Sequence, residues 1–244
     1  MDRPGRGTSL AFSKGMATSI QTTDRQMGQG WVSSARQAWY GMRPIWWRNY
    51  WGLRVSGLEN LPASGAMIFC AHHTSHLDAA AILAALPKAI ALEVTTVAAR
   101  DVWGGTPLRS LLSRITTNAV EVDRDADFAG GVRMLSAVLA ENRPIILFPE
   151  GRRSLDGELV EFKEGAAMLA VRNGVPIVPI YIDGAHEVMP RGRMWPEMGE
   201  ICVKFGKSID PADFERGRGR EARREVYAAM TGELRRRIMA LRPV

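Results

Sequence analysis

The chain has 244 residues, of which 46% are hydrophobic and 24% are charged, a composition typical of a folded domain and not of a disordered or fibrous chain. This length suits one α/β domain with terminal additions. The net charge of +6 favours an anionic partner such as phosphate, lipid headgroups or nucleic acid. The longest uncharged stretch, residues 60–77, contains a proline and three histidines, so we expect no membrane-spanning helix.

The N-terminal residues 1–30 scatter glycine, serine and threonine among a few charges and lack a continuous apolar segment. We therefore expect a flexible N-terminal extension and not a signal peptide. The two cysteines, Cys70 and Cys202, lie in apolar segments without metal-ligand spacing. They give little support to a disulfide or a structural zinc site, and a reducing compartment fits them best.

Residues 31–51 hold five of the seven tryptophans, together with arginines and no acid. Their apolar positions recur at steps of three and four, which predicts an amphipathic helical segment. Pro44 removes an amide donor and disfavours helical geometry at Arg43, so we expect a pair of short helices joined near Pro44. Interfacial tryptophans and arginines predict docking on an anionic membrane, whereas the alternative is that the stripe packs onto the domain as ordinary core.

From residue 52 onward, apolar runs bounded by turn residues alternate with helical stretches. The predicted strands are residues 66–71, 95–99, 118–122, 143–148, 175–182 and 201–205. The predicted helices are residues 78–86, 106–115, 126–141 and 163–173. This alternation indicates an α/β domain over residues 52–244, with a central, mostly parallel or mixed sheet flanked by helices. An apolar stripe with arginine-rich flanks after Pro211 predicts a basic C-terminal helix.

Three of the four histidines, His72, His73 and His76, fall within five positions directly after a predicted strand. Strand ends are where ligands bind in such folds. His73 and Asp78 are five positions apart across a turn, so the carboxylate would accept a proton from one ring nitrogen and leave the other as a base. Two alternatives compete with this dyad. A metal site lacks the His-Glu-x-x-His pattern and further ligands, so none is expected. In the other alternative, the histidines only cap the helix and fill a polar loop.

A second polar segment, Phe148 to Ser154, follows another apolar strand. Its glycine would let backbone amides approach an anion closely, and Arg152 and Arg153 offer forked donors to phosphate. Arg124 stands just past a further predicted strand. Each signal alone is weak, but together they place a histidine, acids and arginines at the ends of successive strands.

These segments resemble the motifs of the glycerolipid acyltransferase superfamily. His73 to Asp78 is similar to its His-x-x-x-x-Asp motif, and Phe148 to Ser154 to its Phe-Pro-Glu-Gly-Thr-Arg-Ser motif. Val122 to Arg124 resembles the arginine-bearing second block, Val175 to Pro179 the fourth, and Gly57 to Pro62 the usual lead-in. The similarity covers about two thirds of the chain and is nearest to the small bacterial 1-acylglycerol-3-phosphate acyltransferases.

The resemblance implies transfer of a fatty acyl group from acyl-CoA or acyl carrier protein to the hydroxyl of 1-acylglycerol 3-phosphate, giving phosphatidic acid for phospholipid biosynthesis. It implies that His73 is the general base, that Asp78 fixes its tautomer, and that no cofactor is needed beyond the thioester substrate. The implied acceptor-binding residues are Arg124, Glu150, Gly151, Arg152 and Arg153. Glu150 would bind a glycerol hydroxyl or orient an arginine, and Lys163 is expected to be a solvated helix end.

Two positions depart from the family pattern. His72 stands where asparagine is frequent, and Arg152 replaces a threonine and adds positive charge where the acceptor headgroup is expected. Another acceptor, such as lyso-ornithine lipid or a lysophospholipid, therefore stays open. We expect membrane lipids as partners and a peripheral position on the cytoplasmic face of the cell membrane. A catalytically silent lipid- or nucleic-acid-binding protein is the alternative, although few aromatics accompany the basic residues outside residues 31–51, so no nucleic acid partner is expected.

Overall fold

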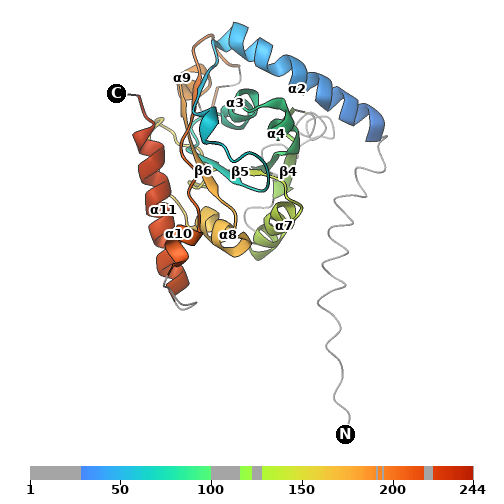
Figure 1. Cartoon of the computed structure of the whole chain (residues 1–244). Helices are drawn as coiled ribbons and strands as arrows, with labels where there is room; N and C mark the ends of the chain where they lie inside the picture. The colour runs from blue at the N-terminus through green and yellow to red at the C-terminus, as the bar shows by residue number, and fades with distance from the viewer. Residues whose placement is uncertain are drawn as a thin grey trace.

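The computed structural model describes residues 29–99, 116–122, 128–190, 192–193, 195–216 and 222–243. In this part of the chain, seven strands form one sheet in the order β1-β7-β6-β2-β5-β3-β4, with helices on both faces (Figure 1). The strands are β1 (Arg54–Ser56), β2 (Ile68–Ala71), β3 (Thr95–Ala99), β4 (Ala119–Val122), β5 (Ile145–Leu147), β6 (Ile177–Asp183) and β7 (Cys202–Phe205). The predicted helix at 106–115 and most of the predicted N-terminal extension lie outside the described residues.

The sheet is mixed, as predicted. All neighbouring strands are parallel except β6 and β7, which run antiparallel, and β1 is parallel to β7. All six predicted strands are present with small shifts at their ends. The additional strand β1 was not predicted, because its three residues are too short to show a strand pattern.

Two hydrophobic cores lie on the two faces of the sheet. In β2, Phe69 and Ala71 belong to the core under α3 (Asp78–Ala85) and α4 (Lys88–Glu93). Ile68 and Cys70 point to the opposite core, beneath the second set of helices. These helices are α7 (Phe128–Ala140), α8 (Gly165–Asn173) and α11 (Arg223–Ala240). Because the central strands are buried on both faces, their sequences are continuous apolar runs.

Shorter elements complete the described fold: η1 (Leu58–Asn60), α9 (Ala185–Val188) and α10 (Ala212–Glu215). The predicted C-terminal stripe is confirmed, since Val226, Met230, Leu234 and Ile238 of α11 are buried. Part of the basic character of α11 is balanced within the helix, where Glu233 pairs with Arg236 and Arg237. No helix in the described ranges is long and apolar enough to cross a bilayer.

The prediction of two N-terminal helices was wrong. Residues Gln29–Trp51 form one continuous helix, α2, with Pro44 inside it. A proline within a helix costs about 3 kcal/mol. Packing on both sides of Pro44 offsets this cost: Tyr40 precedes it, Trp47 follows it, and both are buried in the core that α2 shares with α3 and α4 (Figure 1). Burial of one large apolar side chain contributes about 1.5–3 kcal/mol, so two such anchors hold both halves of the helix in line.

Candidate active site

The candidate site lies where two neighbouring parallel strands end. β2 and β5 pair in parallel through Ile68 to Cys70, so the segments that follow them leave the sheet at the same edge. We call residues 72–77, after β2, the histidine loop, and residues 148–154, after β5, the Glu-Gly-Arg turn. The parallel register explains why two motifs far apart in sequence meet in space.

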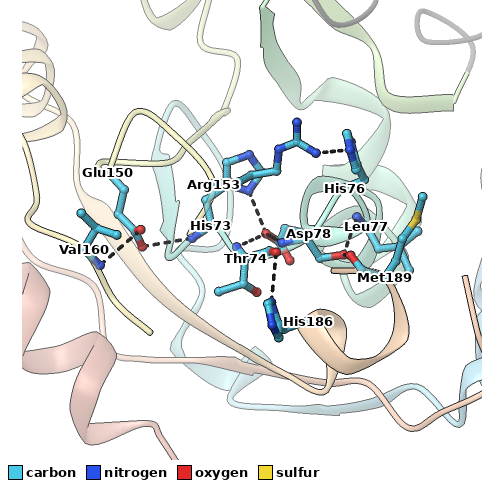
Figure 2. A network of polar contacts seen from close by, with 11 residues as sticks. His73, Thr74, His76, Leu77, Asp78, Glu150, Arg153, Val160, His186 and Met189 are labelled. Atoms are coloured by element: carbon cyan, nitrogen blue, oxygen red, sulfur yellow. Dashed lines mark hydrogen bonds and ion pairs between the residues drawn. The ribbon is translucent and has the colours of Figure 1, made fainter. Parts of the chain in front are cut away.

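Three contacts join the histidine loop to the Glu-Gly-Arg turn. The backbone N–H of His73 donates to Glu150 Oε1 at 3.1 Å, and its carbonyl accepts from the N–H of Ser154 at 2.8 Å. The side chains of Arg153 and His76 are also in contact (Figure 2). The two motifs therefore lie side by side, as predicted.

His73 and Asp78 form the predicted pair. His73 Nδ1 lies 2.8 Å from Asp78 Oδ2, and the same oxygen accepts the backbone N–H groups of Thr74 and Ser75, each at 2.8 Å (Figure 2). Asp78 is fully buried and begins α3, where the helix N-terminus favours negative charge. Since a carboxylate only accepts hydrogen bonds, Nδ1 carries the hydrogen and Nε2 is the basic nitrogen.

The imidazole of His73 is also fixed by ring packing. Its ring stacks on that of Phe148, from the Glu-Gly-Arg turn, with centroids 4.0 Å apart and planes inclined by 17°. The side chain remains 16% exposed. The ring is thus held by a carboxylate on one edge and an aromatic ring on its face, and it is still reachable by a substrate.

Glu150 is a buried carboxyl group that fastens the histidine loop. It is 2% exposed, and its two oxygens accept the backbone N–H groups of His73 and Val160, the second at 3.4 Å. Burial raises the pKa of Glu150 to about 7, against the opposing effect of these two bonds. This fastening role had no signal in the sequence, because the partners are backbone groups of distant segments.

Gly151 is a position that only glycine suits. Its φ is +71°, and a Cβ there would lie 3.2 Å from Lys163 Nζ. The Lys163 side chain is exposed, as the sequence indicated, and its ammonium lies over the Glu-Gly-Arg turn. Arg152 is exposed and Arg153 half-buried in the same turn, so three cationic side chains gather there. Arg124 lies outside the described residues.

The three clustered histidines turn to different partners. His72 is 2% exposed and stacks on Tyr181 at 4.5 Å, and burial lowers its pKa. His73 faces Asp78 and His76 faces Arg153. Cys70 is a core residue whose pKa is raised by burial, which disfavours the thiolate and agrees with its expected place on the strand.

His186 is a neighbour of the site that the sequence did not reveal. Its Nδ1 lies 3.5 Å from the carbonyl oxygen of Thr74, behind the histidine loop (Figure 2). Its ring also packs beside Gly157, where a Cβ would approach it to 3.1 Å. Because His186 and Thr74 are 112 positions apart, no spacing rule connects them.

Comparison with known proteins agrees with this geometry. Residues 52–183 match the acyltransferase family, and because they make up more than half of the chain, the protein belongs to that family. A 1-acyl-sn-glycerol-3-phosphate acyltransferase of Bacillus subtilis is 26% identical over 191 residues, which cover 78% of this chain and 88% of that protein. The crystal structure of the 1-acyl-sn-glycerophosphate acyltransferase PlsC from Thermotoga maritima shares the fold. It matches with a TM-score of 0.62 and 24% identity, over 96% of this chain and 89% of the other.

Plant relatives are longer proteins. The chloroplastic 1-acyl-sn-glycerol-3-phosphate acyltransferase BAT2 of Brassica napus is 30% identical over 139 residues, covering 57% of this chain and 39% of that protein. A 1-acyl-sn-glycerol-3-phosphate acyltransferase from Limnanthes douglasii is 31% identical over 168 residues, covering 66% of this chain and 56% of the other. The chain thus spans about two fifths to one half of the length of these relatives.

Proposed function

We propose that the protein transfers a fatty acyl group from a thioester to the free hydroxyl of 1-acylglycerol 3-phosphate, giving phosphatidic acid. The observation that carries this proposal is the joining of the His73–Asp78 pair to a turn that bears two arginines and has the ammonium of Lys163 over it. Such a site offers a base for a hydroxyl and a cationic wall for a phosphate within one pair of loops. The names of the Bacillus and Thermotoga proteins support the same acceptor.

In the proposed reaction, His73 Nε2 takes the proton of the acceptor hydroxyl as its oxygen attacks the thioester carbonyl carbon. The negative charge of Asp78 stabilises the imidazolium that forms. The C–S bond then breaks, and the departing thiolate receives the proton from His73. No covalent acyl-enzyme is needed, and general-base help of this kind contributes about 10²–10⁴-fold to the rate.

The acceptor phosphate would lie against the Glu-Gly-Arg turn. Arg153 and Arg152 carry forked donors suited to phosphate oxygens, and the ammonium of Lys163 lies over Gly151 beside them. Arg124 is proposed as a further phosphate ligand from the sequence motif alone. Each hydrogen bond to a charged group contributes about 1.5–3 kcal/mol, so one arginine accounts for at least a tenfold change in acceptor affinity.

We also propose that α2 docks the protein on a lipid surface. Trp47 and Trp51 are core residues at 2% exposure, but they lie beside the predicted stripe, which runs through Met42, Trp46 and Tyr50. The outer side presents Met42 at 62%, Trp46 at 47% and other exposed apolar side chains. No acid lies between residues 29 and 58. An aromatic face without negative charge suits the interface of an anionic membrane.

A second exposed apolar pair lies next to α2. Trp195 and Met198, after α9, are 77% and 76% exposed. Their segment is attached to the end of α2, because Trp51 Nε1 donates to the carbonyl oxygen of Glu197 at 3.1 Å. We include this segment in the proposed membrane-facing surface.

The function is tested by acyl transfer with purified protein in detergent. The donors are acyl-CoA and acyl carrier protein thioester, and the acceptors are lysophosphatidic acid, lysophosphatidylcholine, lyso-ornithine lipid and glycerol 3-phosphate. We expect phosphatidic acid from lysophosphatidic acid, and a loss of about 10²–10⁴-fold in His73→Ala with unchanged folding. If the thioester is not consumed with any acceptor while the protein still binds vesicles or RNA, the result favours the alternative function, a binding protein without catalytic activity.

A further inference from the structure

Like His72, His76 has been given no part so far in the proposed acyl transfer. It belongs to the histidine loop, yet its side chain turns to the Glu-Gly-Arg turn, where Nε2 contacts the guanidinium NH1 of Arg153 (Figure 2). The two residues are 77 positions apart, and both side chains are half-buried. This contact is therefore built by the fold and is not a chance encounter on a mobile surface.

The chemistry of the two groups decides the direction of the bond. A guanidinium has donors only, so the His76 nitrogen must accept, and the ring must be neutral with its hydrogen on Nδ1. Burial lowers the pKa of His76, and the neighbouring cation Arg153 and His73 lower it further, while Asp78 opposes them. The neutral, accepting form is thus the stable one near pH 7.

We propose that His76 is a positioning residue whose ring accepts a hydrogen bond from Arg153 and holds the guanidinium toward the acceptor phosphate. The inference rests on the proposed function, in which Arg153 binds that phosphate. An arginine side chain has many rotamers, and freedom that is lost only when substrate arrives weakens binding. A preset guanidinium avoids that loss.

The same contact makes acceptor binding sensitive to acid. A protonated His76 has no lone pair to offer and repels Arg153, so this hydrogen bond is lost as pH falls. The groups that face His76 are Arg153 from the Glu-Gly-Arg turn, His73 from its own loop and Asp78 at the start of α3. Because Arg153 binds the acceptor phosphate in the proposed reaction, protonation of His76 raises the KM for the acceptor.

Two variants separate positioning from general structure. His76→Ala removes the acceptor, and His76→Gln keeps a carbonyl acceptor near the Nε2 position without a titrating group. We expect His76→Ala to raise the acceptor KM about tenfold with kcat and the donor KM within twofold. His76→Gln should restore the KM to within about threefold and flatten its rise below pH 7. Addition of His76→Ala to Arg153→Ala should change the KM less than twofold.

Equilibrium binding of glycerol 3-phosphate gives a readout that does not need turnover. We expect about tenfold weaker binding in His76→Ala, rescue in His76→Gln, and thermal unfolding close to that of the parent protein. If turnover is absent but this pattern of binding is observed, the proposed function fails and the inference stands. Equal binding of glycerol 3-phosphate by His76→Ala and the parent protein overturns the inference. The inference is also overturned if His76→Ala and His76→Gln weaken this binding equally and do so even when Arg153 is already replaced by alanine.

Discussion

The substitution Asp78→Asn tests how the carboxylate serves His73. Among the described residues, Asp78 receives three hydrogen bonds that all end on one atom, Oδ2: from His73 Nδ1 and from the backbone N–H groups of Thr74 and Ser75, each at 2.8 Å. An asparagine amide oxygen at this place accepts the same three bonds, whereas an NH₂ group there would face three donors. We therefore expect the variant to keep the tautomer in which His73 Nε2 is the base.

The size of the effect follows from what is lost. A hydrogen bond to a charged group contributes about 1.5–3 kcal/mol and a neutral one about 0.5–1.5 kcal/mol. With the bond retained and the charge removed, the imidazolium loses about 1–2 kcal/mol of stabilisation, which is about 5- to 30-fold in kcat. An inverted tautomer, in contrast, costs about 10⁴-fold in the serine proteases where it occurs.

The assay is the initial rate of acyl transfer at saturating donor and acceptor. Asp78→Asn is compared with His73→Ala and with Asp213→Asn, which removes an exposed surface partner of Arg216 and serves as the charge control. We expect the control to match the parent protein, Asp78→Asn to lose 5- to 30-fold, and His73→Ala to lose more. A loss near 10⁴-fold in Asp78→Asn refutes the tautomer argument, and a rate equal to the parent refutes the dyad.

Three further predictions concern stability and membrane binding. The pKa of Glu150 is raised from 4.5 to about 7, so the folded state favours the protonated carboxyl and its stabilising contribution falls as pH rises through this range. The free energy of unfolding, measured with urea at pH 5 and pH 8, should differ between the two pH values by about 2–3 kcal/mol less in Glu150→Gln than in the parent protein. An equal difference in both proteins would contradict the raised pKa of Glu150. Gly151→Ala should cost about 1–2 kcal/mol in the same assay because φ is +71°, while Gly232→Ala, in open space on α11, should stabilise by up to about 1 kcal/mol. Trp46→Ala should weaken pelleting of the protein with anionic liposomes without unfolding it, whereas Trp47→Ala should lower the free energy of unfolding by about 3–5 kcal/mol. If Trp46→Ala instead destabilises the protein and Trp47→Ala weakens liposome binding, α2 is not the docking element.

The helix α2 shows where a local rule fails. Proline chemistry at Pro44 argues for a break, and for an isolated peptide that argument is sound. In the protein, Tyr40 on one side and Trp47 on the other are anchored in the same core, so the helix continues through Pro44. The periodic stripe was right about the helix but could not show which tryptophans are buried. Which tryptophans are buried depends on which side of α2 packs against α3 and α4, and α2 carries apolar side chains on two sides.

The sequence alone determined the features that depend on local order. The alternation of apolar runs and helical stretches predicts an α/β sheet, and the five-residue spacing of His73 and Asp78 predicts their pairing, because a single turn decides whether they meet. Only the tertiary structure decided the contacts of Glu150 with His73 and of Arg153 with His76, each across 77 residues. Such contacts depend on β2 lying beside β5. Strand order results from the summed packing of two cores, and no local pattern of residues records that sum.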